Sequence, residues 1–200
     1  MVSNFQRYKG ILEYIDAANI CINEKKLDID FCIYGASYQD GSSIKDLILN
    51  MLGFRESLEQ IIKDKIFRYQ LIDKLTLQGY VFSPNEIYNN IDLLIFPSYL
   101  NAVGRPVFEA AFYRVPSIVA VKNAFSDTIV NNETGVCIDE KNPKAIAEAI
   151  EALYSDNKFL LSLGEKSYDL ANTLYSSEKN ANTFYALYKD LVEKDKNVQK

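Results

Sequence analysis

The sequence predicts an α/β protein with a doubly wound parallel sheet and helices on both faces. Short apolar runs alternate with stretches of helical periodicity along most of the 200 residues, which is the pattern of strand–helix–strand units. Glycine or proline ends several of these runs, as expected where buried strands turn into loops. The 48% hydrophobic and 24% charged content is that of an ordinary globular chain, so we expect a single domain over residues 1–200.

The apolar runs are the predicted strands, and they cover residues 29–34, 75–78, 92–96 and 116–121. The predicted helices cover residues 8–26, 44–73, 106–113, 143–154 and 177–193, with another from residue 157. The segment 44–73 is long for one connection, and an interruption near Gly53 divides it into two helices. Pro84 begins a further short helix, because proline suits the first turn. One more short helix and strand are expected to end near Asp139.

The composition excludes several classes of function. The chain has no histidine, which removes the commonest general base and every histidine-containing metal site. Its net charge is −5 and it has no basic stripe, so we expect no nucleic-acid partner. Cys21, Cys32 and Cys137 stand far apart among apolar residues and are expected to be reduced. The sequence shows neither a membrane-spanning run nor a secretory signal, so a cytoplasmic location is expected.

Glycine, lysine and glutamate residues recur where predicted strands end and helices begin. In a parallel sheet these positions share one edge, where backbone amides face bound ligands. They are the pair Lys9–Gly10, the strand-closing Gly35 and Gly79, the segment Gly104–Pro106, and Glu109. We interpret this edge as a pocket for a nucleotide diphosphate, in which Lys9 neutralises phosphate and Glu109 accepts hydrogen bonds from ribose hydroxyls. Taken singly, each residue also fits a solvated charge or a turn.

The order of these motifs resembles the C-terminal domain of the group 1 glycosyltransferases, also called family 4. Those are retaining enzymes of the two-domain GT-B architecture that use nucleotide-sugar donors. The resemblance therefore implies a Rossmann-like fold that forms one half of a GT-B enzyme. It covers most of the chain and rests on residues 4–10, 32–35, 77–81, 94–98, 103–110, 115–119 and 134–136.

The resemblance implies roles for particular residues. Lys9 would hold the diphosphate of the nucleotide sugar, and Glu109 would bind its ribose. The backbone around Tyr80 and Val81 would meet the base. The remaining residues expected to line the nucleotide-sugar site are Asn4, Gly35, Val103, Gly104 and Arg105, of which the loop from Val103 to Arg105 would face the sugar and the phosphates.

Two positions depart from the family pattern. Asn101 stands where the family has a glutamate close to the donor sugar, and Asn4 stands where an arginine usually precedes the Lys-Gly pair. Asn101 can exchange hydrogen bonds with sugar hydroxyls, but it carries no charge to stabilise a developing cation. Lys9 and Arg105 would then share the neutralisation of phosphate, although a solvated loop charge accounts equally well for Arg105. Lys9, Asn101 and Glu109 are the candidate catalytic residues.

In the family, an N-terminal domain binds the acceptor and the reaction takes place between the domains. We expect that half to be absent from this sequence, the isolated domain to be inactive without it, and the helix at 176–193 to cross back onto it. Phe184, Tyr185 and Tyr188 would then face the other half, although aromatic residues at helical spacing also fit a local core.

The resemblance also implies the chemistry and its setting. The expected reaction needs no metal and no cofactor beyond the nucleotide sugar. The acceptor would be a sugar or a lipid-linked glycan in cell-surface polysaccharide or lipopolysaccharide biosynthesis. Because lipid-linked acceptors lie in a membrane, the enzyme could be peripheral to its inner face.

Two other functions stay open. One is a non-catalytic module that binds nucleotide sugar or docks a separate acceptor-binding partner, which Asn101 favours. The other is a sugar-nucleotide epimerase of the same fold, which fits less well because no histidine or acidic base is evident. Asp28-Ile29-Asp30 matches the Asp-x-Asp metal motif of the other large glycosyltransferase fold. Both aspartates precede a strand at the end opposite the expected pocket, so we predict no metal site there.

Overall fold

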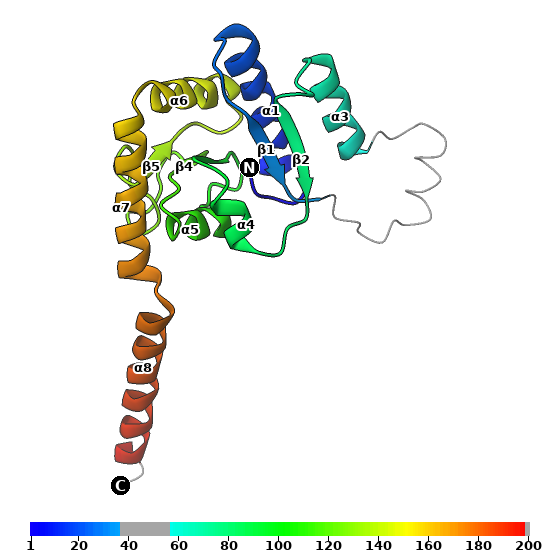
Figure 1. The fold of residues 1–200 in the computed structure, drawn as a ribbon. Helices are drawn as coiled ribbons and strands as arrows, with labels where there is room; N and C mark the ends of the chain where they lie inside the picture. The colour runs from blue at the N-terminus through cyan, green and yellow to red at the C-terminus, as the bar shows by residue number, and fades with distance from the viewer. Residues whose placement is uncertain (37–56, 199–200) are drawn as a thin grey trace, which may run out of the picture.

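The strands of the molecule run parallel and lie in two sheets. The structure is a computed structural model that describes residues 1–36 and 57–198. Val2 forms a parallel bridge to Tyr34, and in Figure 1 the N-terminus lies between the two sheets. One sheet pairs β1 (Phe31–Tyr34) with β2 (Leu75–Gly79), and the other has the order β3 (Leu94–Phe96), β4 (Ser117–Val119), β5 (Gly135–Cys137).

Helices connect and cover the strands (Figure 1). The helices of the main body are α1 (Ile11–Asn19), α3 (Leu58–Arg68), α4 (Pro84–Tyr88), α5 (Arg105–Ala111), α6 (Pro143–Ser155) and α7 (Asn157–Tyr175). α8 (Ser177–Val198) extends away from this body. Proline stands in the first turn of α4, α5 and α6, where its missing N–H has no intrahelical partner to lose.

Two apolar cores lie on opposite faces of the sheets. Successive side chains of a strand point to opposite faces, so Ile95 belongs to one core and its neighbour Phe96 to the other. Ile33 and Ile118 join Ile95 in the first core, against α1, α3 and α6. Val119 joins Phe96 in the second core, against α4 and α5. Helices therefore pack on both faces, which confirms the predicted doubly wound α/β fold.

Two predicted elements differ from the structure. Gly10 has a φ of 74°, so a short 3₁₀ turn, η1 (Arg7–Lys9), precedes α1, and a π-helical turn, η2 (Ile20–Glu24), follows α1. The short helix predicted before the last strand is wrong, because residues 122–134 form turns. There the Val130 N–H donates to Thr134 Oγ1, and Asn132 has a left-handed φ of 59°, which ends helical geometry. The interruption predicted near Gly53 lies outside the described residues.

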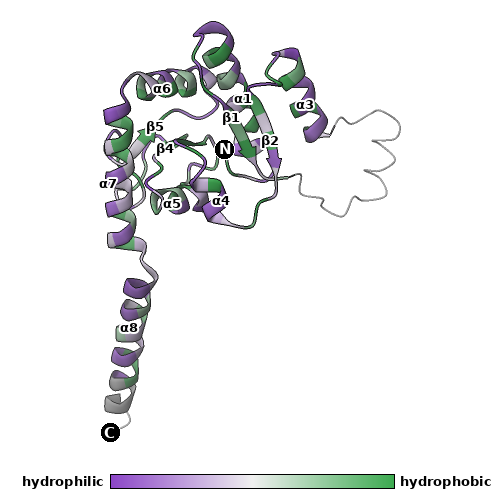
Figure 2. Ribbon diagram, in the orientation of Figure 1, coloured by the Kyte–Doolittle hydropathy of each residue, from purple (hydrophilic) through white to green (hydrophobic). Residues whose placement is uncertain are grey.

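α8 exposes an apolar face. Figure 2 shows apolar residues mixed with hydrophilic ones along this helix. Phe184, Tyr185 and Tyr188 expose 56%, 71% and 62% of their surfaces, so they form no local core within the described part of the chain. The crossing of this helix onto a second domain stays a prediction. No helix among the described residues combines the length and the apolarity that crossing a membrane requires.

α7 passes too close to the segment before β4 to allow a side chain at Gly164. A Cβ atom there would lie 2.2 Å from the carbonyl oxygen of Arg114 and 3.4 Å from Cδ of Pro116. We expect Gly164→Ala to lower the free energy of unfolding by about 1–3 kcal/mol, because this overpacking outweighs the better helix propensity of alanine. Chemical denaturation measures the loss.

Ser162, exposed on the same helix, provides the control for Gly164. Ser162→Ala should change the free energy of unfolding by less than about 0.5 kcal/mol. A Gly164→Ala protein as stable as the Ser162→Ala protein would contradict the close approach.

Candidate functional site

The predicted site residues follow the carboxyl ends of the strands. Tyr34 is paired with Gly79 in β2, and the N–H of Gly35 donates to the carbonyl oxygen of Gly79 at 2.7 Å. A Cβ atom on Gly35 would lie 1.9 Å from the carbonyl oxygen of Ser3, whereas a Cβ on Gly79 would meet nothing within 4 Å. The absence of a side chain at Gly35 therefore lets the N-terminal segment, which includes the exposed Asn4, approach the end of β1.

Lys9 lies beside the end of β3. The N–H of Tyr99 donates to the carbonyl oxygen of Tyr8 at 2.8 Å, which holds η1 against the segment after β3. Lys9 Nζ stands 5.2 Å from the ring centroid of Tyr8 and 5.5 Å from that of Phe96. Within residues 1–36 and 57–198, Lys9 has no carboxylate at ion-pair distance. Its ammonium thus rests on aromatic faces and keeps its charge available for an anion.

Gly104 brings the start of α5 onto the same aromatic ring. Gly104 is the N-cap of α5, and a Cβ atom there would lie 2.4 Å from Cζ of Phe96. Lys9, Phe96 and Gly104 therefore lie together at the carboxyl edge of the sheet, and we call this place the candidate site. Sequence reasoning did not identify Phe96 as part of this site, because its apolar run predicts only a buried strand.

Glu109, on α5, has a different partner on each carboxylate oxygen. Oε2 accepts a hydrogen bond from the hydroxyl of Tyr88 at 2.8 Å, and Oε1 lies 3.0 Å from Nε of Arg105. The Arg105 side chain is 86% exposed and that of Glu109 is 30% exposed, so water weakens this ion pair. Tyr88 is buried, and its burial together with the Glu109 carboxylate raises the pKa of its hydroxyl well above that of an ordinary tyrosine.

Tyr88 is a second site residue that sequence reasoning missed. It ends α4, and its hydroxyl reaches a carboxylate 21 residues further along the chain. The sequence offers only its position in a short helix at the same edge of the sheet. Nothing local to that helix indicates where the hydroxyl points.

The other predicted residues occupy two kinds of position. Val81 and Val103 pack against the second core, which leaves their backbone as the part available to a ligand. Tyr80 is 68% exposed and forms an edge-to-face pair with Phe82, at 4.7 Å between ring centroids. Asn101 lies exposed between β3 and α5 with a φ of 45°, a conformation that asparagine tolerates.

Asp28 and Asp30 lie at the opposite end of β1 and share one partner. Lys74, just before β2, places its Nζ 2.9 Å from Oδ1 of Asp28 and 3.0 Å from Oδ1 of Asp30. The hydrogen bond from Lys74 lowers the pKa of Asp28. The two aspartates thus hold a lysine, and in the described part of the chain no group of three or more Cys, Asp or Glu side chains could hold a metal ion.

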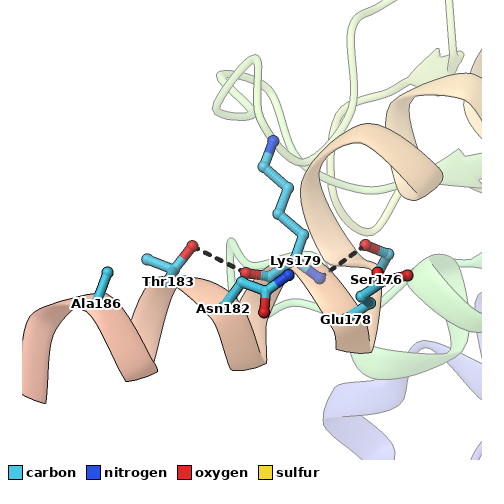
Figure 3. A pocket seen from close by; sticks show the side chains of 6 residues that line it. All are labelled: Ser176, Glu178, Lys179, Asn182, Thr183 and Ala186. Carbon is cyan, nitrogen blue, oxygen red and sulfur yellow. Dashed lines mark hydrogen bonds between the residues drawn. The ribbon is translucent and has the colours of Figure 1, made fainter. Parts of the chain in front are cut away.

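An open hollow of 640 Å³ lies where α7 meets α8, away from these residues (Figure 3). Its lining residues are Ser176, Glu178, Lys179, Asn182, Thr183 and Ala186. The polar groups there complete the start of α8: the Lys179 N–H donates to Ser176 Oγ at 3.2 Å, and Thr183 Oγ1 donates to the Lys179 carbonyl at 2.9 Å. None of the predicted site residues lines this hollow.

The sequence matches a family model and several characterised relatives. The family model for glycosyl transferases group 1 matches residues 1–170. The capsular polysaccharide biosynthesis glycosyltransferase CapM of Staphylococcus aureus is 27% identical over 88% of this chain. The chain spans 42% of CapM, and it spans less than two thirds of each curated relative that it was matched with.

Solved structures share the fold. The C-terminal domain of the group 1 glycosyl transferase LpcC from Francisella tularensis has a TM-score of 0.70 and 23% identity, covering 88% of this chain and 85% of that one. HepE from Anabaena, in complex with UDP-glucose, has a TM-score of 0.71 and 16% identity, covering 92% of this chain and 47% of that one. These likenesses confirm the predicted Rossmann-like fold of a GT-B half.

The contact between Gly104 and Phe96 can be tested by enlarging one partner and reducing the other. Gly104→Ala should lower the free energy of unfolding by about 1–3 kcal/mol, because the added methyl group overlaps the ring. Phe96→Leu makes room for that methyl group, so the double variant should be more stable than the sum of the two single losses predicts. Urea unfolding of the four proteins measures this coupling. Strictly additive losses would show that the clash lies elsewhere.

Proposed function

Because the chain belongs to the group 1 glycosyltransferase family, we propose that the candidate site binds a nucleotide-diphosphate sugar and supports retaining transfer of the sugar to an acceptor. The observation that carries the proposal is the arrangement around Phe96. There the ammonium of Lys9 has no carboxylate partner among the described residues, and Glu109 lies on the helix that begins after Gly104. A cation and a hydrogen-bond acceptor near the same edge of the sheet match a diphosphate joined to a ribose.

Lys9 and Arg105 are the proposed partners of the diphosphate. The Lys9 ammonium is held over two rings, and Arg105 is exposed enough to leave Glu109 for a phosphate. When the bond between sugar and phosphate breaks, negative charge grows on the departing diphosphate. Cations already in place stabilise that charge without reorganisation, so they lower the barrier without a metal or another cofactor.

The remaining groups of the nucleotide sugar have proposed partners on the same edge. Glu109 accepts hydrogen bonds from the ribose hydroxyls, because each of its oxygens retains a free lone pair. The backbone at Tyr80 and Val81 meets the base. The loop from Val103 to Arg105 faces the sugar, and Asn101 contributes hydrogen bonds but no charge.

The acceptor is proposed to bind outside this chain. The chain spans 42% of CapM, a capsular polysaccharide biosynthesis enzyme, and α8 exposes an apolar face around Phe184 and Tyr188. We propose that an N-terminal acceptor-binding half packs there and presents a sugar or lipid-linked glycan in surface polysaccharide or lipopolysaccharide assembly. Such acceptors would place the reaction at the cytoplasmic face of a membrane.

A non-catalytic nucleotide-sugar module is the second candidate function. Asn101 favours it, because a neutral amide in an exposed turn stands where the family has a glutamate. The two candidates share the same binding site and differ only in whether turnover follows.

Nucleotide binding tests the proposed site. Isothermal titration with UDP, GDP and ADP should show selective binding of one nucleotide. Lys9→Met keeps the apolar stem over the rings and removes the charge, and Glu109→Gln removes the carboxylate. Each variant should weaken binding about ten- to a hundredfold, the range for losing one hydrogen bond to a charged group. Affinities in EDTA and in Mg²⁺ should agree, because Lys9 and Arg105 supply the positive charge.

Lys74→Met is the matched control for Lys9→Met, since Lys74 lies at the amino ends of the strands. It should leave nucleotide affinity unchanged. If Lys74→Met and Lys9→Met weaken nucleotide binding equally, the loss reflects the overall charge of the protein and not a site at Lys9. A folded protein that binds none of the three nucleotides would overturn the proposal.

Turnover separates the two candidate functions. Release of nucleoside diphosphate from a nucleotide sugar should be undetectable for the chain alone and should appear when an N-terminal acceptor-binding half is added. Replacing Phe184 and Tyr188 together by serine should abolish the stimulation and leave nucleotide affinity unchanged, because that face of α8 is separate from the candidate site. Nucleotide binding without turnover in the complete assembly would favour the non-catalytic module.

A further inference from the structure

Tyr88 carries a buried polar group with a single side-chain partner. The residue is 1% exposed and belongs to the second core. A hydroxyl buried this deeply requires a hydrogen-bond partner, and that partner is Oε2 of Glu109 at 2.8 Å. One hydrogen bond thus connects the second core to Glu109.

The two oxygens of Glu109 differ in how firmly they are held. Oε2 is bound from inside by Tyr88, whereas Oε1 faces Arg105, which is 86% exposed. A glutamate carboxylate otherwise rotates broadly about its last torsion. The inner hydrogen bond removes that freedom and leaves the outer oxygen for a ligand.

The direction of the hydrogen bond is set by the protonation of Tyr88. Burial, and next the hydrogen bond to Glu109, raise the pKa of the Tyr88 hydroxyl well above that of an ordinary tyrosine. The proton therefore stays on Tyr88 throughout the neutral range. Tyr88 acts as the donor and Glu109 as the acceptor.

Tyr113 offers a close comparison in the same aromatic layer. Its ring lies 5.4 Å from the ring of Tyr88 between centroids, at an interplanar angle of 31°. Its hydroxyl donates to Oδ1 of Asn85 at 2.6 Å, on an exposed surface. Removing either hydroxyl keeps the ring packing, but only one of them touches Glu109.

We infer that Tyr88 is a positioning residue that orients the Glu109 carboxylate to recognise the ribose of the bound nucleotide. This inference rests on the proposed function. A fixed acceptor strengthens hydrogen bonds to the 2′- and 3′-hydroxyls, because less conformational entropy is lost on binding. The chain would therefore distinguish ribose from sugars that lack these hydroxyls through a residue that never touches the ligand.

The test compares a nucleoside diphosphate with its 2′,3′-dideoxy form by isothermal titration. The nucleotide is whichever of UDP, GDP and ADP the wild-type chain binds best. Tyr88→Phe should weaken binding of the ribonucleotide about three- to tenfold and leave binding of the dideoxy form nearly unchanged. Tyr113→Phe, the matched control, should change neither. In a Glu109→Gln background, Tyr88→Phe should have a smaller effect, because the two residues act as one unit.

Each outcome has a separate meaning. If Tyr88→Phe weakens both nucleotides equally, or neither, Tyr88 has only a packing role and the inference is overturned while the nucleotide site stands. If the wild-type chain binds no nucleotide, both the proposed function and this inference are wrong. Should Tyr88→Phe unfold on heating before titration is practical, Glu109→Asp tests the same contact from the exposed side. Aspartate keeps the negative charge, but its side chain is one methylene shorter, so the carboxylate lies further from the Tyr88 hydroxyl. Unchanged ribose selectivity in this variant would overturn the inference.

Discussion

The ring of Phe96 is the contact that joins the segments of the candidate site. It ends β3, and the pairing of Phe96 with Val119 in β4 fixes its place in the sheet. The ammonium of Lys9 stands over this ring, and Gly104 lies against it so closely that no side chain would fit. Two segments separated by about ninety residues of sequence therefore meet on one side chain, as the carboxyl edge of a parallel sheet allows.

The two ends of the strands use lysine in different ways. At the amino ends, Lys74 is paired with Asp28 and Asp30, so its charge is neutralised within the protein. At the carboxyl ends, Lys9 rests on the faces of Tyr8 and Phe96. An aromatic face attracts a cation without cancelling its charge, so Lys9 keeps a positive charge at this edge of the sheet. In a protein with a net charge of −5, Lys9 thus supplies the positive charge for the anion that we propose to bind there.

Much of the architecture could be predicted from the sequence because the relevant signals are local. Apolar runs closed by glycine or proline marked β1, β2 and β3, and Pro84, Pro106 and Pro143 marked the first turns of helices. The rule that parallel strands end at one edge then placed Lys9 and Glu109 on the same side. The segment 122–134 was predicted wrongly, because side-chain hydrogen bonds such as that of Thr134 compete with a helix and leave little trace in periodicity.

The sequence by itself determined the order of strands and helices, the edge on which the candidate residues lie, and the family to which the chain belongs. These follow from spacing along the chain, which folding does not alter. Only the tertiary structure decided that Phe96 joins Lys9 to Gly104, that Tyr88 holds Glu109, and that the aromatic face of α8 is uncovered. Such contacts join residues far apart in sequence, so they depend on strand register and helix packing, which no local pattern encodes.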